Sequence, residues 1–521
     1  MPEATPALQS RGVGYTYYQL MERNRNKIAQ VDALTGEEQT YGELLQRCIG
    51  AAIAMEAEGL KPGDFISICS LNHLDVCVPY LASLFTGVIC ASVEPTMLAQ
   101  EMVYLLNQVG PKIIFVGQEA VDTIRNVVDD LQTKPLVVVF GTCGTYTSFS
   151  EFIHRPTKGF APRVPMDLNE TALVLFSSGT TGRPKAICHS HKSMLADYQY
   201  IIGKSFSSIA GFATPYWVSY HAIQHMCIIH GLRKIVYPRF DVSNPWRIFD
   251  FKIDLVMVNP LQALSFLAHE PPDGVDFQNL KYMAFGGNDI SKEQILRLRS
   301  RFPLTKVVNM YGQTELFGGP FLYPFHTNSW DLTIKYPTCV GIIKDTVSWK
   351  VVDIETGQTL GPNQQGELLL KTERQFKGYH NRDSSDAFDH EGWLRTGDLF
   401  YYNEEMCFFV VNRMKESFKF QAHHIIPSEI EHVLLSHPAI AKAVVLGLPH
   451  ETENNHPMAV IQLHPKGPRV SEEEIVRYVE QRVADKNRLR AGVKFVRAIP
   501  LTVTDKVNRF KLREMIINCS I

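Results

Sequence analysis

The segment Phe176–Ala186, FSSGTTGRPKA, is flanked by the apolar runs ALVLF and AICH. These runs predict two β-strands joined by the segment, a strand-loop-strand arrangement. Gly179 and Gly182 permit positive φ angles, so successive backbone N–H groups can turn inward and form a nest for phosphate oxygens. The loop also carries four hydroxyl groups and one ammonium group as further donors: Ser177, Ser178, Thr180, Thr181 and Lys185. Phosphate is therefore the ligand that the sequence predicts for this loop.

This loop differs from the common phosphate-binding loop G-x-x-x-x-G-K-[ST]. Pro184 stands where the second glycine should be, and Ala186 stands where a hydroxyl residue should follow Lys185. A strand also follows the loop, whereas a helix follows it in ordinary nucleotide triphosphatases. A polar hairpin turn that binds nothing is the alternative for a Ser/Thr/Gly turn, but the order of these eleven residues is far more specific than that.

Composition places the chain among globular proteins of more than one domain. Its 521 residues, 45% of them apolar, are too many for one ordinary hydrophobic core. The 52 Lys and Arg residues nearly balance the 54 Asp and Glu residues, which argues against nucleic acid or an anionic membrane as a partner. The 10 cysteines include no C-x-x-C pair, so reduced thiols in an intracellular protein fit best.

The pattern of apolar residues predicts an α/β fold. An amphipathic helical pattern at 40–60 precedes an apolar strand pattern at 64–70, and similar alternation continues through the first four hundred residues. The uncharged run 76–93 is interrupted by Pro79 and Gly87, which predicts a buried helix followed by a buried strand. We therefore expect no transmembrane segment.

After about Asn412 the predicted elements become shorter. Ser471 and Glu474 form a capping box at the start of a helix, and this helix lies between predicted strands at 458–464 and 493–500. We expect a small α+β domain of roughly a hundred residues to follow a large α/β domain.

SSGTTGRPKA resembles the signature of the adenylate-forming, or AMP-binding, superfamily, which comprises acyl-CoA synthetases, peptide-synthetase adenylation domains and beetle luciferases. The resemblance extends from about Tyr41 to Phe510. It implies an N-terminal AMP-binding domain of αβαβα-type subdomains at 1–411, a hinge at 412–415 and a mobile C-terminal domain at 416–521.

Two further segments resemble nucleotide-binding motifs of this family. In MYGQTE, Tyr311 offers a face for stacking on adenine, Gly312 lets the backbone approach, Thr314 meets the α-phosphate, and Glu315 is a hard oxygen ligand suited to Mg²⁺. The resemblance also assigns nucleotide contacts to Gln313 and to residues of the segment FGGND, namely Gly286, Gly287 and Asn288. In isolation, a solvated loop with one acid would be the better explanation of MYGQTE.

The resemblance places the remaining site residues near the C-terminus. In GWLRTGDLFYYNEE, Asp398 accepts the two ribose hydroxyls, for which a carboxylate has two acceptor oxygens. In VVNRMKESFKF, Arg413 reaches the ribose, Lys415 lies at the pivot and Lys419 takes part in thiolation. Lys506 corresponds to the catalytic lysine, which neutralises charge that builds up on the phosphoryl oxygens and the attacking carboxylate.

The chemistry that the resemblance implies has two half-reactions. A carboxylic acid and MgATP give an acyl-adenylate and pyrophosphate, and the thiol of coenzyme A then displaces AMP to give a thioester. The segments after Gly392 look most like the branch of insect fatty acyl-CoA synthetases and beetle luciferases, which points to a medium- or long-chain fatty acid or another apolar carboxylic acid. The aromatic and aliphatic stretches 216–226 and 316–330 are typical of an apolar tunnel or of ordinary core.

The chain departs from the family pattern at several positions. Val218 stands where many relatives have a histidine that gates the acyl pocket. Asp505 replaces the glycine before Lys506 and adds a negative charge that could hold the lysine away from phosphate. Asn412 and Ala422 replace an acid and a glycine in the hinge region, and Ala422 could crowd a narrow thiol path.

These departures leave two rival functions open. One is a luciferase-like monooxygenase that adenylates an aromatic acid and lets oxygen attack it, and the other is a degenerate paralogue that binds nucleotide or acyl ligand without turnover. The histidine pairs at His189 and His423 have metal-like spacing, but core or surface histidines are expected. The end of the chain, NCSI, lacks a Ser-Lys-Leu type address. An intracellular location is expected, either the cytosol or, by family analogy only, the peroxisome.

Overall fold

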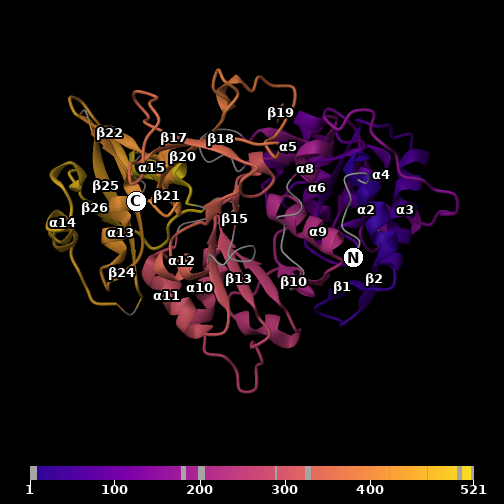
Figure 1. Ribbon diagram of the computed structural model, residues 1–521, viewed down its shortest axis with the longest axis horizontal. Coiled ribbons are helices and arrows are strands. Elements are labelled where there is room, and N and C mark those ends of the chain that lie inside the picture. The colour runs from indigo at the N-terminus through magenta and orange to yellow at the C-terminus, as the bar shows by residue number, and fades with distance from the viewer. Residues whose placement is uncertain are drawn as a thin grey trace. The chain divides into compact units, whose positions relative to one another are not determined.

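A computed structural model of the chain describes residues 9–142, 144–177, 184–196, 206–287, 290–322, 330–421, 423–465, 467–501 and 507–517 (Figure 1). These residues form two compact units. The larger unit comprises Met1–Ser177, Pro184–Ser348 and Lys371–Leu394, and the smaller unit comprises Trp349–Leu370 and Arg395–Ile521, each within the described ranges. The mixed α/β architecture that the sequence predicts is confirmed.

The first sheet of the larger unit has the strand order β19-β9-β8-β4-β3-β5-β6-β7 among the described residues. Its strands are β3 (Phe65–Cys69), β4 (Ile89–Cys90), β5 (Ile113–Val116), β6 (Leu136–Val139), β7 (Thr147–Ser148), β8 (Thr171–Phe176), β9 (Ala186–Ser190) and β19 (Gly378–Tyr379). β8 and β9 run antiparallel, with Phe176 paired with Ala186. The predicted hairpin around FSSGTTGRPKA is therefore confirmed.

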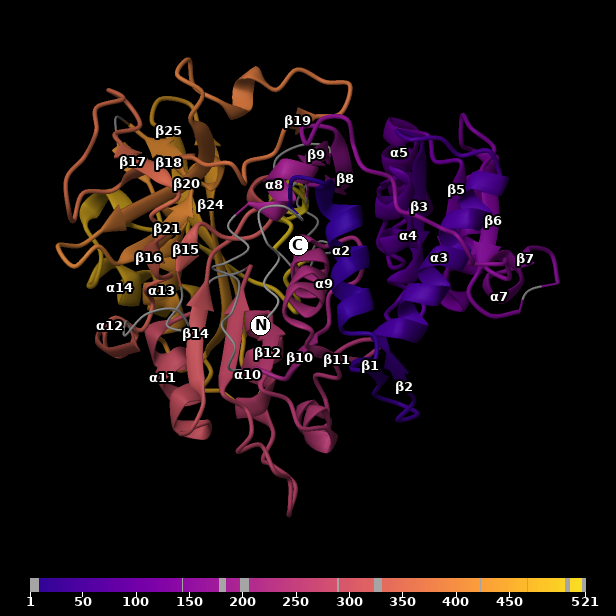
Figure 2. The same ribbon diagram turned by 45° about the vertical axis from the view of Figure 1, so that its right-hand side comes forward.

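Helices cover both faces of this sheet, because the apolar residues of its strands point alternately to the two sides. Ile66 and Ile68 of β3 belong to one core, whereas Phe65 and Cys69 belong to the other. The first core includes α2 (Gly12–Arg23), α3 (Tyr41–Ala57) and α4 (Val78–Thr86), and the second includes α5 (Ala99–Val109) and α6 (Val121–Asp129). Figure 2 shows α3, α4 and α5 around β3, β5 and β6. α4 followed by β4 is the buried helix and strand expected for the run 76–93.

The second sheet of the larger unit has the order β14-β13-β12-β10-β11-β1-β2. Its strands are β1 (Ile28–Asp32), β2 (Glu38–Thr40), β10 (Ser208–Gly211), β11 (Arg233–Val236), β12 (Leu255–Val258), β13 (Tyr282–Gly286) and β14 (Lys306–Met310). β13 and β14 are parallel and end together, with Gly286 paired with Met310. The loops that follow them therefore leave from one edge of the sheet, where α/β folds bind ligands.

Helix α9 (Val218–His230) contributes to the cores of both sheets. Tyr220, Ile228 and Ile229 pack in the core of the first sheet, whereas Ile223 and Met226 pack against the second. On its other face, the second sheet is covered by α10 (Pro260–Ala268) and α11 (Lys292–Arg301). The shorter elements of this unit are η1 (Gln118–Ala120), α7 (Phe149–Phe152), α8 (His191–Leu195), η3 (Pro245–Asp250), η4 (Thr314–Leu316), β15 (Phe321–Leu322), α12 (Trp330–Lys335), β16 (Ile342–Ile343) and η5 (Ser385–Ala387).

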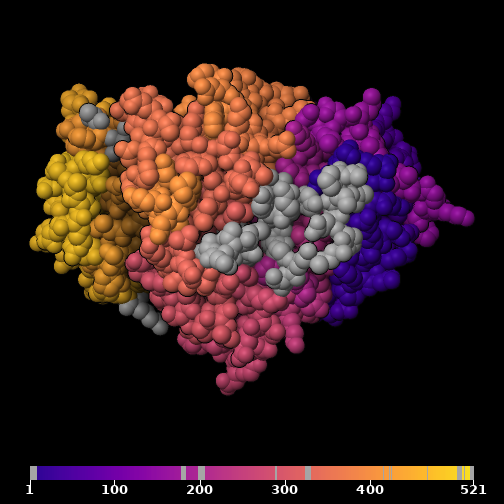
Figure 3. Space-filling model, in the orientation of Figure 1, coloured from indigo at the N-terminus to yellow at the C-terminus, as the bar shows by residue number. Residues whose placement is uncertain are grey.

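The smaller unit contains two sheets, and its residues after about 400 are orange to yellow in Figure 3. One has the order β17-β18-β20-β21 and consists of β17 (Ser348–Val352), β18 (Gly366–Lys371), β20 (Leu394–Tyr402) and β21 (Phe408–Arg413). The other consists of β22 (Phe418–Phe420), β23 (His423–Ile425), β24 (Ile440–His450), β25 (Asn454–Leu463) and β26 (Val493–Phe495). The remaining elements are η6 (Met414–Glu416), α13 (Pro427–Leu435), α14 (Glu472–Glu480), η7 (Asp485–Asn487) and α15 (Arg509–Ile517).

The predicted capping box is present at α14, where the Ser471 hydroxyl accepts from the Glu474 backbone N–H and the Glu474 carboxylate accepts from the Ser471 backbone N–H. β25 and β26 flank this helix in sequence, as expected. The predicted hinge at 412–415 lies at the end of β21 and in η6, and its role stays a prediction. Within the described ranges, no helix combines the length and apolarity needed to cross a membrane.

Candidate active site

The base of the loop after β8 is held by two hydrogen bonds between Ser177 and Lys185. The Ser177 backbone N–H donates to the Lys185 carbonyl at 2.9 Å, and the Lys185 backbone N–H donates to the Ser177 hydroxyl at 2.9 Å. This closure brings the two ends of the loop together. The other predicted phosphate contacts lie outside the described residues, and their role stays a prediction: Ser178, Gly179, Thr180, Thr181 and Gly182.

Tyr379 brings the loop base close to the MYGQTE segment. β19 pairs with β9 so that Tyr379 lies opposite Ile187, and the Lys185 ammonium group lies 4.3 Å from the centroid of the Tyr379 ring. Burial, and then the negative charge of Glu315, raises the pKa of Tyr379 to about 12. Lys185 of FSSGTTGRPKA and Glu315 of MYGQTE thus both act on the Tyr379 side chain.

Sequence reasoning missed Tyr379. The only signal is the pair Gly378–Tyr379 in the segment KGYHN, and a single sequence does not show that this pair forms a strand against β9.

The backbone after β14 makes a tight turn that requires glycine at position 312. A Cβ atom at Gly312 would lie 2.6 Å from the Gly318 carbonyl oxygen. The Gln313 backbone N–H donates to that same carbonyl at 2.9 Å, which closes the turn. Since real Cβ atoms do not approach a carbonyl so closely, any larger residue would open the segment.

Buried side chains fix the backbone that carries Thr314 and Glu315. The buried His189 ring donates from Nε2 to the Thr314 carbonyl oxygen at 2.8 Å, and burial lowers the pKa of His189 to about 3, so the ring is neutral. The buried Arg374 donates from Nη2 to the Phe317 carbonyl oxygen at 2.7 Å. Thr314 and Glu315 themselves remain partly exposed.

The predicted adenine wall lies beside the start of the same segment. A Cβ atom at Gly286 would lie 2.4 Å from the Met310 carbonyl oxygen, so only glycine permits this approach of β13 to β14. Gly287 has a φ of 95°, a conformation that favours glycine. The Tyr311 ring packs edge-on against Phe321, with centroids 5.9 Å apart. Gly286 and Tyr311 are thus neighbours, whereas Asn288 lies outside the described residues.

A buried carboxylate that sequence reasoning missed organises the segment before α9. Glu94 accepts from the Thr214 hydroxyl at 2.5 Å and from the Trp217 indole N–H at 3.2 Å. The Tyr216 hydroxyl donates to the Ser177 carbonyl oxygen at 3.4 Å, so this segment lies next to the loop base. Val218, which stands where the resemblance leads us to expect a histidine, is the first residue of α9. The pairing of Glu94 with residues 120 or more positions away leaves no local signal in the sequence.

In the smaller unit, the predicted ribose residues face each other across β20 and β21. Asp398 is paired with Arg413 in the strand register, and Arg413 Nε lies 3.5 Å from Asp398 Oδ1. The Asp398 side chain is only 4% exposed, whereas that of Arg413 is 40% exposed. The Asp398 backbone N–H donates to the Thr396 hydroxyl at 3.2 Å, and Thr396 in turn donates to the Leu368 carbonyl at 2.7 Å. This network fixes the backbone at Asp398.

The three predicted functional lysines of the smaller unit stay predictions. Lys415 lies in η6, and its side chain is outside the described atoms. Lys419 lies on β22, with Nζ 3.8 Å from Glu355 Oε1 and both side chains more than half exposed, a pair that contributes little stability. Lys506 lies outside the described residues, between Leu501 and Val507, which form an isolated antiparallel bridge.

The first histidine pair with metal-like spacing lies in the core, as expected, whereas only His423 of the second pair has a described side chain. His189 and His191 are both buried, and the Val13 backbone N–H donates to His191 Nδ1 at 3.2 Å. His423 is exposed on β23.

Two sequence families match the chain. The family described as AMP-binding enzyme matches residues 18–380. The family described as AMP-binding enzyme C-terminal domain matches residues 429–506. The chain belongs to the AMP-binding enzyme family. This membership places it in the adenylate-forming superfamily that SSGTTGRPKA resembles, a superfamily of ATP-dependent enzymes that includes CoA ligases.

The names of the relatives in this AMP-binding family describe different activities. The luciferin 4-monooxygenase of Photinus pyralis is 31% identical, and the match covers 94% of this chain and 91% of that protein. The peroxisomal OPC-8:0-CoA ligase 1 of Arabidopsis thaliana is 29% identical, with 94% and 90% covered. The solved structure of the luciferase-like enzyme from the nonluminescent mealworm Zophobas morio is 28% identical, with a TM-score of 0.75 and coverage of 79% and 97%.

Proposed function

We propose that the chain is a MgATP-dependent acyl-CoA synthetase that activates a medium- or long-chain fatty acid through an acyl-adenylate. The observation that carries this proposal is the convergence of Lys185 and Glu315 on Tyr379, because it joins the two predicted phosphate-binding motifs at one place in the larger unit. Lys185 contacts the Tyr379 ring and the charge of Glu315 acts on the same side chain. A cation and a carboxylate are the two kinds of group that a metal-bound polyphosphate requires.

In the proposed adenylation step, the fatty acid carboxylate attacks the α-phosphorus and pyrophosphate leaves. Lys185 and the hydroxyl-rich loop bind phosphate oxygens, Thr314 donates to the α-phosphate, and Tyr311 stacks on adenine. Glu315 fits a magnesium ligand because its carboxylate is partly exposed on a backbone fixed by buried residues. Mg²⁺ would neutralise phosphate charge when bound there.

Residues of the smaller unit complete the proposed reaction. Asp398 accepts the ribose hydroxyls, and Arg413, which already faces it, orients the carboxylate. Lys506 stabilises the negative charge of the adenylation transition state. Lys415 and Lys419 act around the hinge when coenzyme A attacks the adenylate and AMP leaves.

The proposed apolar acyl group rests on the resemblance of the segments after Gly392 to insect fatty acyl-CoA synthetases. The name of the Arabidopsis relative describes a CoA ligase, which supports the thioester product. The buried side chains of α9 do not bear on the acyl group, because Ile223, Met226, Ile228 and Ile229 pack in the cores of the two sheets.

The experiment measures pyrophosphate and AMP release from MgATP with acids from acetate to long-chain fatty acids, each with and without coenzyme A. Acid-dependent release that is faster with coenzyme A for one chain-length class is expected. Lys185→Met should abolish this release, whereas Lys192→Met, an exposed lysine paired with Glu373, should not. An absence of acid-dependent AMP formation with every chain length would exclude the ligase.

A second candidate function is a luciferase-like monooxygenase, which the names of relatives such as the Photinus protein favour. In that case the adenylate of an aromatic acid would react with oxygen. Light emission or oxygen uptake with ATP and luciferin, in the absence of coenzyme A, would support this function. Acid-dependent thioester formation without oxygen uptake would exclude it.

A third candidate is a degenerate paralogue that binds nucleotide or acyl ligand without turnover. Asp505 and Ala422, both outside the described residues, motivate it. Restoration of strong activity to an inactive protein by Asp505→Gly would support this candidate, and robust activity of the natural sequence would exclude it.

We propose an intracellular location in the peroxisome or the cytosol. The Arabidopsis relative is peroxisomal by name, which supports the first of these. Immunofluorescence of the untagged chain against a peroxisomal marker distinguishes the two, and recovery from the culture medium would contradict both.

A further inference from the structure

The hairpin formed by β24 and β25 brings two histidines to one face. His450 is paired with Asn454 and His456 with Leu448, so the two histidines are diagonal neighbours in the antiparallel ladder. Side chains in such diagonal positions point to the same side of a sheet and are within reach of each other. Glu453 lies in the three-residue turn between the strands, beside the ends of both.

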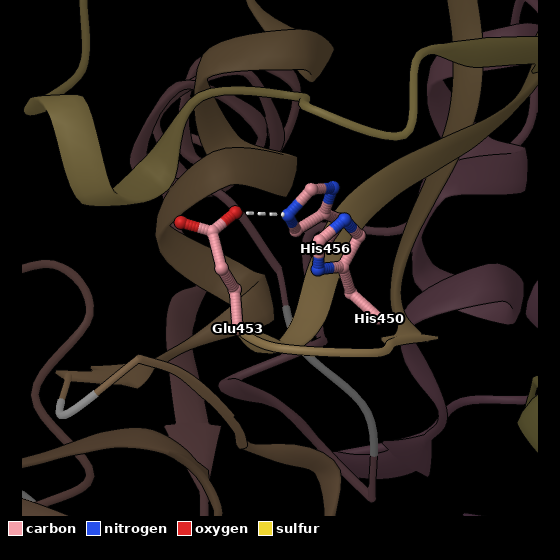
Figure 4. A group of neighbouring side chains, drawn as sticks. All are labelled: His450, Glu453 and His456. Carbon is pink, nitrogen blue, oxygen red and sulfur yellow. Dashed lines mark hydrogen bonds and ion pairs between the residues drawn. The ribbon is translucent and has the colours of Figure 1, made fainter.

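The three side chains converge (Figure 4). The imidazole rings of His450 and His456 are stacked, with centroids 3.9 Å apart and planes at 14°. His456 Nε2 lies 2.7 Å from Glu453 Oε2. One ligand atom from each of the three residues lies within 4.8 Å of the other two. The two histidines and the glutamate have the spacing H-x-x-E-x-x-H in the sequence. They form a compact cluster because the chain reverses direction in the turn that contains Glu453.

Two imidazoles and one carboxylate are the ligand set of a borderline divalent metal ion such as Zn²⁺. Such an ion binds nitrogen and oxygen at about 2.0–2.2 Å, which places tetrahedral ligands about 3.3 Å apart. The ligand atoms lie within 4.8 Å of one another, and His450 is exposed and His456 partly exposed, so both rings have room to rotate toward this separation. Hard cations such as Mg²⁺ prefer oxygen ligands and are disfavoured here.

The second oxygen of Glu453 has a partner of its own. Gln421 Nε2 donates to Glu453 Oε1 at 2.6 Å, and the Gln421 backbone N–H donates to the Glu453 carbonyl at 2.9 Å. A metal-binding carboxylate is commonly held in this way by a neighbouring donor. Gln421 therefore orients Glu453 and leaves Oε2 directed at the histidines.

We propose that His450, Glu453 and His456 form a binding site for a divalent transition metal ion of the zinc class, with the fourth position open to water. Metal binding would stabilise the contact between the hairpin turn and β22 with the residue that follows it. Gln421 contacts Glu453, and the Asn455 side chain donates to the Lys419 carbonyl at 3.1 Å. The site is independent of the proposed ligase activity, since its metal affinity is measured on the protein alone.

The test uses the full-length, untagged chain after removal of metal with a chelator. Titration with Zn²⁺ against a chromophoric competitor gives affinity and stoichiometry, and Co²⁺ absorption in the visible range reports tetrahedral nitrogen and oxygen ligands. We expect one saturable site that excess Mg²⁺ does not displace. His450→Ala, His456→Ala and Glu453→Gln should each lower the Zn²⁺ affinity at least about 100-fold, and Gln421→Ala about 10-fold.

His464→Ala is the matched control, because His464 is an exposed histidine of the same unit outside the cluster. It should leave the Zn²⁺ affinity unchanged. Circular dichroism of every variant checks the fold, and Glu453→Gln, which keeps the size of the side chain, remains informative if a histidine variant unfolds. The proposal is overturned if the natural chain shows no saturable Zn²⁺ binding, or if Glu453→Gln and the histidine variants bind as the natural chain does.

Discussion

The Lys185 ammonium group lies 4.3 Å from the centroid of the Tyr379 ring, although 194 positions separate the two residues in the sequence (379 − 185). The pairing of β19 with β9 creates this contact, since it sets Tyr379 opposite Ile187. The aromatic face thus holds the Lys185 ammonium group at the end of the loop that follows β8.

Tyr379→Leu should weaken ATP binding about fivefold, because a cation–π contact contributes about 1 kcal/mol. Tyr379→Phe keeps the aromatic face and should bind ATP as the natural chain does. Isothermal titration calorimetry with MgATP measures both affinities. Equal affinities for the Leu and Phe variants would show that the ring does not position Lys185.

Gly312→Ala should destabilise the turn after β14, because the added Cβ would lie 2.6 Å from the Gly318 carbonyl oxygen. We expect a loss of about 1–3 kcal/mol in the free energy of unfolding and a loss of acid-dependent pyrophosphate release. The control is Gly144→Ala, where no atom lies within 4 Å of the new Cβ. Urea unfolding measures the stability, and similar values for the two variants would contradict the steric explanation.

Stability should fall as the pH is lowered below about 6.5, because the larger unit buries neutral histidines. Burial lowers the pKa of His189 and His225 to about 3 and that of His221 to about 4. The unfolded chain therefore binds more protons than the folded chain between these values and about 6.5. At pH 5 each histidine should lower the free energy of unfolding by about 2 kcal/mol relative to neutral pH.

Urea unfolding between pH 7 and pH 5 measures this dependence. His225→Gln removes one titrating group, so its stability should change less steeply with pH, whatever its stability at pH 7. A slope identical to that of the natural chain would mean that His225 is already protonated in the folded state.

Lys506→Ala should lower the adenylation rate about 10²–10³-fold, which is typical for loss of a preorganised donor at a developing charge. Thioester formation from a supplied acyl-adenylate should change much less, because that step does not attack the α-phosphorus. Asp505→Gly should raise the adenylation rate by removing a negative neighbour of Lys506. Equal losses in both half-reactions for Lys506→Ala would point to a folding defect and not to a catalytic lysine.

Local sequence patterns predicted the elements that depend on neighbouring residues. The hairpin at FSSGTTGRPKA follows from two apolar runs, and the helix at Ser471 follows from a capping box within four residues. The order of residues in MYGQTE likewise predicted roles for Thr314 and Glu315, which the structure leaves partly exposed, and these roles stay predictions.

Features that depend on distant pairing could not be predicted. Tyr379 joins the site through a two-residue strand, and Glu94 reaches Thr214 only after the sheet has formed. The His450, Glu453 and His456 cluster depends on the register of β24 and β25, and one residue of slippage would send the histidines to opposite faces. Each of the two units is built from segments that are not adjacent in the sequence, and no local pattern predicts this division.

Helix α9 belongs to the hydrophobic cores of both sheets of the larger unit. Neither sheet can lose its packing without exposing one side of this helix, so we expect the two sheets to unfold in a single cooperative transition. A substitution on the face of α9 toward one sheet is therefore expected to disturb the packing of the other sheet as well, and these thirteen residues couple the stabilities of the two sheets.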